Sequence, residues 1–302
     1  MGRPHAAVPS YHGQRITVGG YVGIGEILGI AAVALGAGVL GSMLGLGGGV
    51  FIVPILSLAF GIDLKTVIAA SAIAVVANSA SGSAVYLKSR FTNVRLALVM
   101  LVSMVTGALI GGLLAVSLPE VYLKGAFGFL LLYVSFVMFR RSSGGPSAAA
   151  EIDTDAAHDT YRLGGHFYDP AAADTVRYVP KNLRLGIPGA SLAGVASGMF
   201  GIGGGPITVP LYTLVMGVPV KAATSTSSFM FGLTASASAL IYYQNDFVDP
   251  SVTVPAVLGI ISGAKVGAAV NRRVRSKQLT TIFITVLATL AISMLLDAFG
   301  VY

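Results

Sequence analysis

Long uncharged, apolar stretches alternate along this chain with short segments that hold most of its charged residues. A helix needs about 20 apolar residues to cross the hydrocarbon core of a bilayer. Six stretches of this kind predict transmembrane helices: Thr66–Leu87, Leu96–Pro119, Gly125–Phe139 (extended back to Val121), Ala222–Asn245, Ser251–Asn271 (interrupted by Lys265) and Gln278–Leu296. Three of these predicted spans fall in each half of the chain.

Each half opens on a longer uncharged stretch, Ile27–Ile62 in the first half and Leu185–Val220 in the second. Thirty-six residues are too many for one span and barely enough for two. A run of glycines lies in the middle of each stretch. We therefore predict that each stretch forms a glycine-broken helical hairpin that returns to the side of the membrane from which it starts.

The two halves are near copies of one another. A shift of 156 residues superposes AGVLGSMLGLGGGVFIVPIL, from Ala37 to Leu56, on AGVASGMFGIGGGPITVPLY, from Ala193 to Tyr212, without gaps. Between Ala37 and Lys65 this shift gives 13 identities in 29 positions. Both copies keep the glycine run and a proline five residues after it. The chain is therefore a tandem duplication organised around its glycine runs.

The basic residues predict an orientation in the membrane, because cytoplasmic loops carry an excess of lysine and arginine. Counting spans places 14 basic residues on one side and four on the other, namely Arg3, Arg15, Lys65 and Lys124. We predict that the basic loops are cytoplasmic and that both termini lie outside. Each half then holds three spans plus a hairpin that returns, so the halves have opposite orientations. Such inverted repeats are the plan of many secondary transporters.

The predicted fold is an all-α polytopic membrane protein, an inverted repeat of two halves that each contain a glycine-broken helical hairpin plus three transmembrane helices. Tyrosine, phenylalanine and valine residues on both sides of Asp169 and Pro170 predict a short hairpin with its turn at these two residues. For residues 140–185 as a whole, an inter-repeat linker is a simpler interpretation than a regulatory or partner-binding site. The expected units are an N-terminal tail (1–20), a first transmembrane repeat (21–140), a cytoplasmic linker (141–184) and a second transmembrane repeat (185–302).

Composition agrees with this fold and excludes several functions. The chain is 55% hydrophobic and only 10% charged, whereas a soluble domain carries about 25% charge. The net charge of +7 comes from basic loops, so no nucleic-acid partner is expected. There is no cysteine, and the histidines lie outside the apolar stretches, so we expect no metal and no cofactor. The glycine runs follow no predicted strand, no GK[ST] phosphate loop is present, and no histidine is available to an intramembrane nucleophile. We therefore expect no catalytic residues and no enzyme.

The glycine runs are the candidate substrate site. Non-helical backbone survives in a bilayer only where protein buries it or where it lines a cavity. A helix that starts after such a run presents free N–H groups and the positive end of its dipole, which favour an anion, and Pro206 suits the first turn of such a helix. The alternative is close helix contact, which suits glycines three or four apart, as at Gly107/Gly111 and Gly263/Gly267. The runs are contiguous, so we favour anion binding at Gly45, Gly47, Gly48, Gly49, Gly201, Gly203, Gly204 and Gly205.

Polar residues within the predicted spans extend this candidate site. Asn78, Thr224, Ser225 and Thr226 could donate hydrogen bonds to an oxyanion, although serine and threonine in helices often bond to their own backbone instead. Lys265 is the only charged residue inside a span. It would either draw anions to the inner mouth of the pathway or extend its ammonium to the lipid headgroups.

The repeated GxGGGxxxxP motif, placed in the first apolar element of each half, resembles the sulfite exporter family TauE/SafE, also called the toluene sulfonate uptake permeases. The resemblance covers both apolar halves but not residues 1–20 or 141–184. It implies transport of sulfur-containing anions such as sulfite, sulfonates or thiosulfate across the prokaryotic cytoplasmic membrane, and it supports the glycine runs as the site. The first half lacks the dense Thr/Ser run of the second half, so the two halves would not line the site equally.

We therefore expect a multi-pass membrane transporter, acting as an exporter of a small sulfur-containing anion. The alternatives are an anion channel for another small oxyanion or carboxylate, and a membrane scaffold that transports nothing. The expected partners are the anionic substrate and the lipid bilayer, with a homodimer as one candidate assembly.

Overall fold

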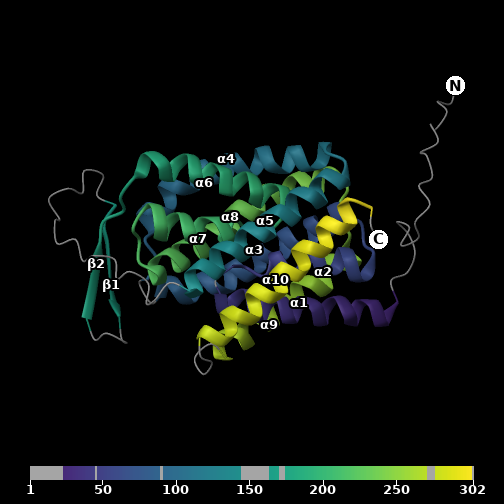
Figure 1. Ribbon diagram of the computed structural model, residues 1–302, viewed down its shortest axis with the longest axis horizontal. Coiled ribbons are helices and arrows are strands. Elements are labelled where there is room, and N and C mark those ends of the chain that lie inside the picture. Colours follow the sequence, from purple (N-terminus) through teal and green to yellow (C-terminus); the bar gives the residue numbers. More distant parts are fainter. Residues whose placement is uncertain are drawn as a thin grey trace.

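The computed structural model describes residues 23–44, 46–88, 91–143, 163–169, 174–270 and 276–300, and most of these residues are helical (Figure 1). The first half contains α1 (Ile24–Leu44), α2 (Gly49–Phe60), α3 (Leu64–Lys88), α4 (Val94–Ser117) and α5 (Glu120–Ser143). The second half contains α6 (Leu183–Phe200), α7 (Gly205–Pro210), the π-helical turn η2 (Leu211–Val215), α8 (Val220–Gln244), α9 (Pro250–Val270) and α10 (Ser276–Ala298).

The six predicted spans correspond to α3, α4, α5, α8, α9 and α10, so the prediction of a helix at each of these places is confirmed. Within the described part of the chain, five helical segments are long and apolar enough to cross a membrane: Ile24–Met43, Leu64–Ser81, Val94–Ser117, Glu120–Arg140 and Pro250–Gly267. The chain is thus an all-α polytopic membrane protein, as predicted.

The duplication is visible in the helix boundaries. A shift of 156 residues carries the bounds of α3 onto those of α8, and it carries the first residues of α4 and α5 onto those of α9 and α10. The shift also aligns α2 with α7 and η2. The two halves therefore consist of the same helices in the same order.

Each 36-residue stretch folds as the predicted hairpin. A Cβ atom placed on Gly48, at the start of α2, would lie 3.0 Å from the carbonyl oxygen of Ala37 in α1. A Cβ on Gly29, near the start of α1, would lie 2.9 Å from the ring of Phe60 at the end of α2. The two helices are therefore antiparallel, and α2 returns to the level at which α1 begins.

The second hairpin repeats this arrangement. A Cβ on Gly204 would lie 3.3 Å from the carbonyl oxygen of Ala193. At the other end, a Cβ on Gly186 would lie 2.8 Å from Sδ of Met216. The segment formed by α7 and η2 therefore returns along α6.

The two halves are intertwined rather than side by side. The most extensive helix contacts join α1 to α9, α4 to α6, α5 to α10 and α3 to α8, and each of these pairs takes one helix from each half. Figure 1 shows α4 and α6 lying along one another at one edge of the bundle. Under the 156-residue shift the first two pairs exchange and the last two map onto themselves. This is the contact pattern of a pseudo-twofold arrangement.

Glycines make the closest of these contacts, as predicted for the pairs spaced four residues apart. A Cβ on Gly107 or Gly111 of α4 would overlap a carbonyl oxygen of α6, and one on Gly263 of α9 would overlap the carbonyl oxygen of Leu35 in α1. Backbone therefore meets backbone along both pairs of helices.

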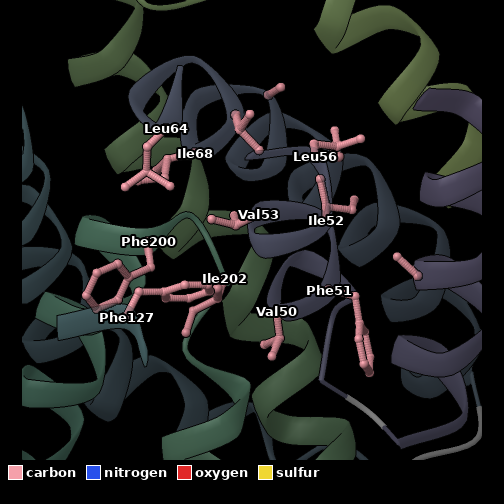
Figure 2. Close-up of a cluster of buried hydrophobic side chains, with 14 of the residues drawn as sticks. Val50, Phe51, Ile52, Val53, Leu56, Leu64, Ile68, Phe127, Phe200 and Ile202 are labelled. Atoms are coloured by element: carbon pink, nitrogen blue, oxygen red, sulfur yellow. The ribbon is translucent and has the colours of Figure 1, made fainter. Parts of the chain in front are cut away.

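Helix α2 of the first hairpin is held inside the protein by a buried apolar cluster (Figure 2). Five side chains of α2 belong to it, and they meet residues from α3, α5 and the end of α6. The rings of Phe127 and Phe200 lie 4.9 Å apart between centroids. Figure 2 labels Val50, Phe51, Ile52, Val53, Leu56, Leu64, Ile68, Phe127, Phe200 and Ile202. Because α2 is surrounded by protein, its irregular start is shielded from lipid.

The predicted hairpin of the linker is confirmed. Strands β1 (Gly165–Asp169) and β2 (Asp174–Tyr178) pair antiparallel, with Phe167 opposite Val176. They project from one end of the bundle (Figure 1). The ring of Phe167 is buried 5.3 Å from that of Phe91, and Asn93 Nδ2 donates to the carbonyl oxygen of Leu163 at 2.8 Å. The hairpin is thus docked on the loop before α4. Residues 1–22, 144–162 and 170–173, which include the predicted N-terminal tail, lie outside the described residues.

The other end of the bundle gathers the loops that the charge pattern places outside. Lys65 Nζ donates to the carbonyl oxygen of Val116 at 2.7 Å and lies 5.4 Å from the ring centroid of Phe247. Lys124 and Asp297 form an ion pair at 2.7 Å. Loops predicted to share one side of the membrane therefore contact one another.

Asp63 caps α3 at this same end, which leads to a testable stability effect. Its carboxylate accepts hydrogen bonds from the Thr66 N–H at 3.0 Å and from the Thr66 hydroxyl at 3.3 Å. Burial raises the pKa of the Asp63 carboxyl, but hydrogen bonds from Glu120 and Thr66 lower it by more, so this pKa lies below its ordinary value. We expect Asp63→Ala to destabilise the protein by about 1 kcal/mol at neutral pH, measured by thermal unfolding of the purified protein.

The sign of the pH dependence follows from the lowered pKa. A carboxyl with a depressed folded-state pKa stabilises the fold above its unfolded pKa, and this stabilisation is lost as the pH falls through the folded pKa. The gap in stability between the parent and Asp63→Ala should therefore shrink in acid. Asp63→Asn, whose amide oxygen can still cap the helix, should lose less than the alanine variant. A gap that stayed constant from neutral to acid pH would contradict this assignment.

Candidate functional site

The glycine runs turn the chain between the two helices of each hairpin, and their backbone requires glycine. The φ angles are 81° and 82° at Gly47 and Gly48, and 76° and 80° at Gly203 and Gly204. Residues with a side chain rarely adopt this left-handed region, whereas glycine does so at little cost. The regular helices then begin at Gly49 and Gly205.

The tips of the two hairpins meet each other. A Cβ on Gly49 would lie 2.8 Å from the carbonyl oxygen of Gly201 and 3.1 Å from Cα of Ile202. From the other side, a Cβ on Gly205 would lie 3.3 Å from Cα of Leu46. The structure therefore brings the two runs, 156 residues apart in the sequence, into backbone contact.

Helices α3 and α8 enclose this junction. Ser71 Oγ donates to the carbonyl oxygen of Gly201 at 2.9 Å, and Asn78 Nδ2 donates to that of Gly47 at 3.2 Å. Val75 and Phe231, which the 156-residue shift relates, both lie against Gly203: a Cβ there would be 2.7 Å from Val75 Cγ1 and 3.1 Å from Phe231 Cβ. Each of the two is the twelfth residue of a 25-residue helix, so the junction lies level with the middle of α3 and α8.

Both runs present backbone N–H groups without acceptors. No side chain caps the start of α2 or α7. Within the described part of the chain, no backbone hydrogen bond is donated by the N–H groups of residues 47–49, 203 or 204, although all five residues are buried. An unpaired N–H group in a buried site is costly, and at a helix start it lies at the positive end of the dipole. The junction therefore offers several hydrogen-bond donors and no fixed charge, which is chemistry that suits an anion.

The predicted site residues divide into two groups. Seven glycines of the runs and Asn78 are brought together at the junction, while Gly45 lies outside the described residues. Two predicted hydroxyls of α8 are engaged elsewhere: Ser225 Oγ donates to the carbonyl oxygen of Lys221 at 2.8 Å, and Thr226 Oγ1 accepts the N–H of Asn93 at 3.0 Å. The backbone carbonyl oxygen of Thr224 accepts a hydrogen bond from the hydroxyl of Ser228, one helical turn later, at 2.8 Å.

Lys265 is not brought to the junction. Its side chain is exposed on α9, whereas Gly263 and Gly267 of the same helix contact α1. The residue of α9 that approaches a glycine run is Ile260, whose Cδ1 would lie 2.9 Å from a Cβ on Gly48. This placement favours the interpretation in which the lysine extends its ammonium to the headgroups.

Sequence reasoning did not identify Val75 and Phe231 as part of the junction. Both are apolar residues in apolar helices, and nothing in their local sequence distinguishes them from lipid-facing neighbours. The 156-residue shift gave the only usable signal, because it relates these two positions, but it does not show which helix face lies against the runs.

Comparison with known proteins gives a consistent result. The family model described as "Sulfite exporter TauE/SafE" matches residues 30–294. The "Probable membrane transporter protein YunE" of Bacillus subtilis is 26% identical over 266 residues, which cover 85% of this chain and 93% of that protein. A probable membrane transporter protein of Methanocaldococcus jannaschii is 25% identical over 274 residues, which cover 86% of this chain and 91% of that protein. No solved structure matches the chain.

Proposed function

We propose a substrate for this chain from the fact that it belongs to the sulfite exporter TauE/SafE family. Membership and the names of its relatives make it a multi-pass membrane transporter and not an enzyme. The proposal is that it moves a small sulfur-containing anion of the sulfite, sulfonate or thiosulfate class across the cytoplasmic membrane of a prokaryote, in the outward direction. The glycine runs are the proposed anion site.

One observation carries this proposal: the two sets of unpaired backbone N–H groups that meet between the hairpins. Such groups bind an oxyanion through hydrogen bonds without a counter-charge. A site without a fixed cation avoids holding the anion too tightly for release, which a transporter needs. Glycine at each position lets the backbone itself approach the ligand.

The position of the junction supports a site near the middle of the bilayer. Transporters built from inverted repeats place their substrate at the repeat interface near the midplane, at the ends of broken helices. Here the junction lies between the two halves and level with the middle of α3 and α8. Both hairpins return to their starting level, and three helices follow each of them. We propose on this basis that the second half is inverted relative to the first.

The inverted orientation predicts opposite accessibility at two equivalent positions. Gly61 and Gly217 are related by the 156-residue shift, are exposed, and have no atom within 4 Å of an added Cβ. Since the chain has no cysteine, Gly61→Cys and Gly217→Cys each introduce a single thiol. We expect a membrane-impermeant maleimide to label Gly61→Cys only from outside and Gly217→Cys only from the cytoplasmic side. Labelling of both from one side would indicate a parallel repeat.

The substrate class is tested by a flux screen of the full chain in proteoliposomes. Sulfite, thiosulfate and a short alkyl sulfonate should be carried with saturable kinetics, and sulfate and acetate should compete poorly. Preference for acetate or another carboxylate would contradict the sulfur-anion proposal. Flux that rises linearly with concentration would indicate a channel, and no flux for any of the five anions would favour a scaffold.

A further inference from the structure

Four buried side-chain oxygens in the described part of the chain have no hydrogen-bond partner: those of Thr92, Ser197, Ser227 and Thr253. Two of these residues, Ser197 and Ser227, are completely inaccessible and belong to helices that form the glycine junction. Leaving a buried hydroxyl unpaired is unfavourable, so such a group in a folded protein requires an explanation.

Ser197 lies at the second glycine run. It is in the last turn of α6, and its carbonyl oxygen accepts the N–H of Gly201 at 2.8 Å. Its Cβ would lie 3.5 Å from a Cβ placed on Gly204. The side chain of Ser197 therefore starts beside the residue that precedes α7.

Ser227 lies one helical turn before Phe231 on α8, and the ring of Phe231 would lie 2.5 Å from a Cβ on Gly205. The 156-residue shift relates Ser227 to Ser71, which lies at the junction and donates to the carbonyl oxygen of Gly201 at 2.9 Å. The two serines thus occupy equivalent positions in the two repeats, but of the two only Ser71 has a partner within the described part of the chain.

The neighbouring hydroxyls of α8 are paired in the way that is usual for serine and threonine within a helix. Ser225, Ser228 and Thr234 all donate to carbonyl oxygens of their own helix. Ser227 makes no such bond. In the first half, the residue equivalent to Ser197 is Gly41, which has no hydroxyl at all. Among the described residues, the unpaired hydroxyls at the junction therefore come from the second half.

We infer that Ser197 and Ser227 are substrate ligands that donate hydrogen bonds to an oxyanion at the glycine junction, which makes the site functionally asymmetric. The inference rests on the proposed function. Sulfite and sulfonates present three oxygens on one side of the sulfur atom, so two hydroxyls and the backbone N–H groups together can satisfy one such face. A neutral set of donors of this kind recognises an ionised oxyanion without a lysine or arginine.

The test compares Ser197→Ala and Ser227→Ala with Ser71→Ala in the full chain. Removing an unpaired hydroxyl leaves no protein group without its partner, so the first two variants should keep or raise the thermal unfolding temperature. Both should raise the half-saturating sulfite concentration in proteoliposome flux roughly tenfold, because a hydrogen bond to a charged group is lost. Ser71→Ala, the matched control, should lower the unfolding temperature because the carbonyl of Gly201 loses its donor. Ser227→Cys, a weaker donor of similar size, should fall between the parent and Ser227→Ala.

The outcomes separate this inference from the proposed function. If the parent carries sulfite and both alanine variants keep its half-saturation, the inference is wrong and the proposed function stands. If only one of the two alanine variants raises the half-saturating sulfite concentration, that serine is a substrate ligand and the other is not. A lower unfolding temperature with unchanged half-saturation would assign both hydroxyls a structural role. If the parent carries none of the anions tested, the proposed function fails and this inference fails with it.

Discussion

Gly47→Ala should reduce sulfite flux about tenfold or more, a loss of about 1.4 kcal/mol in transition-state stabilisation, while the protein remains folded. Gly47 has a φ of 81°, so alanine there adopts a left-handed conformation that costs roughly 1–2 kcal/mol. The added methyl group fits, because the nearest atoms of Ile202, Val75 and Phe231 are each 3.7 Å away. It would, however, occupy the space between the two runs where we propose that the anion meets the backbone.

Gly61→Ala is the matched control for this prediction. Gly61 also has a left-handed φ, of 62°, but a Cβ there has no atom within 4 Å and lies at the far end of α2. The Gly61→Ala variant should have a similar backbone strain and should keep the sulfite flux of the parent. Equal flux in the two variants, with both folded, would show that the glycine runs serve the fold only. Valine at Gly48 is less informative, because its Cβ would lie 3.0 Å from the carbonyl oxygen of Ala37 and would disturb the hairpin itself.

Gly198→Ala should prevent folding, or destabilise the protein by more than about 3 kcal/mol. A Cβ on Gly198 of α6 would overlap the carbonyl oxygen of Ala108 on α4. The clash is with the backbone of α4, within one of the most extensive helix contacts between the halves, so no side-chain rotation can relieve it. The measurement is the yield of monodisperse protein and its thermal unfolding temperature in detergent.

Gly36→Ala provides the contrast. Gly36 lies within α1, and an added Cβ meets no atom within 4 Å. Alanine there should stabilise the helix by about 0.5–1 kcal/mol, because it loses less backbone freedom on folding. If Gly198→Ala unfolded at the temperature of the parent, α4 and α6 could not approach as closely as the structure shows.

Most of the fold could be predicted because bilayer physics restricts it. The uncharged stretches give the helices, and each of the six helices begins slightly before its apolar stretch, as when α3 begins at Leu64 rather than at Thr66. Polar residues near membrane interfaces can continue a helix, so hydropathy alone underestimates its length. The hairpins could be predicted because a 36-residue stretch with central glycines has few other solutions.

The site could be predicted only in part. Contiguous glycines identified the junction, since no other residue adopts their backbone conformation so readily. The hydroxyl run of α8 was a weaker guide: Ser225 bonds to its own helix, and Thr226 meets Asn93 from a loop 133 residues earlier. The contacts of Val75 and Phe231 depend on how two halves fit together, and local sequence does not encode that fit.

The most direct test of the central claim is sulfite counterflow in proteoliposomes that contain the full chain. Vesicles loaded with unlabelled sulfite and diluted into a trace of radiolabelled sulfite should accumulate the label transiently above its equilibrium level. The same vesicles with Gly47→Ala should show little accumulation, and those with Gly61→Ala should match the parent. Absence of counterflow with the parent, or equal counterflow in all three preparations, would contradict a sulfur-anion carrier whose site is built from the two glycine runs.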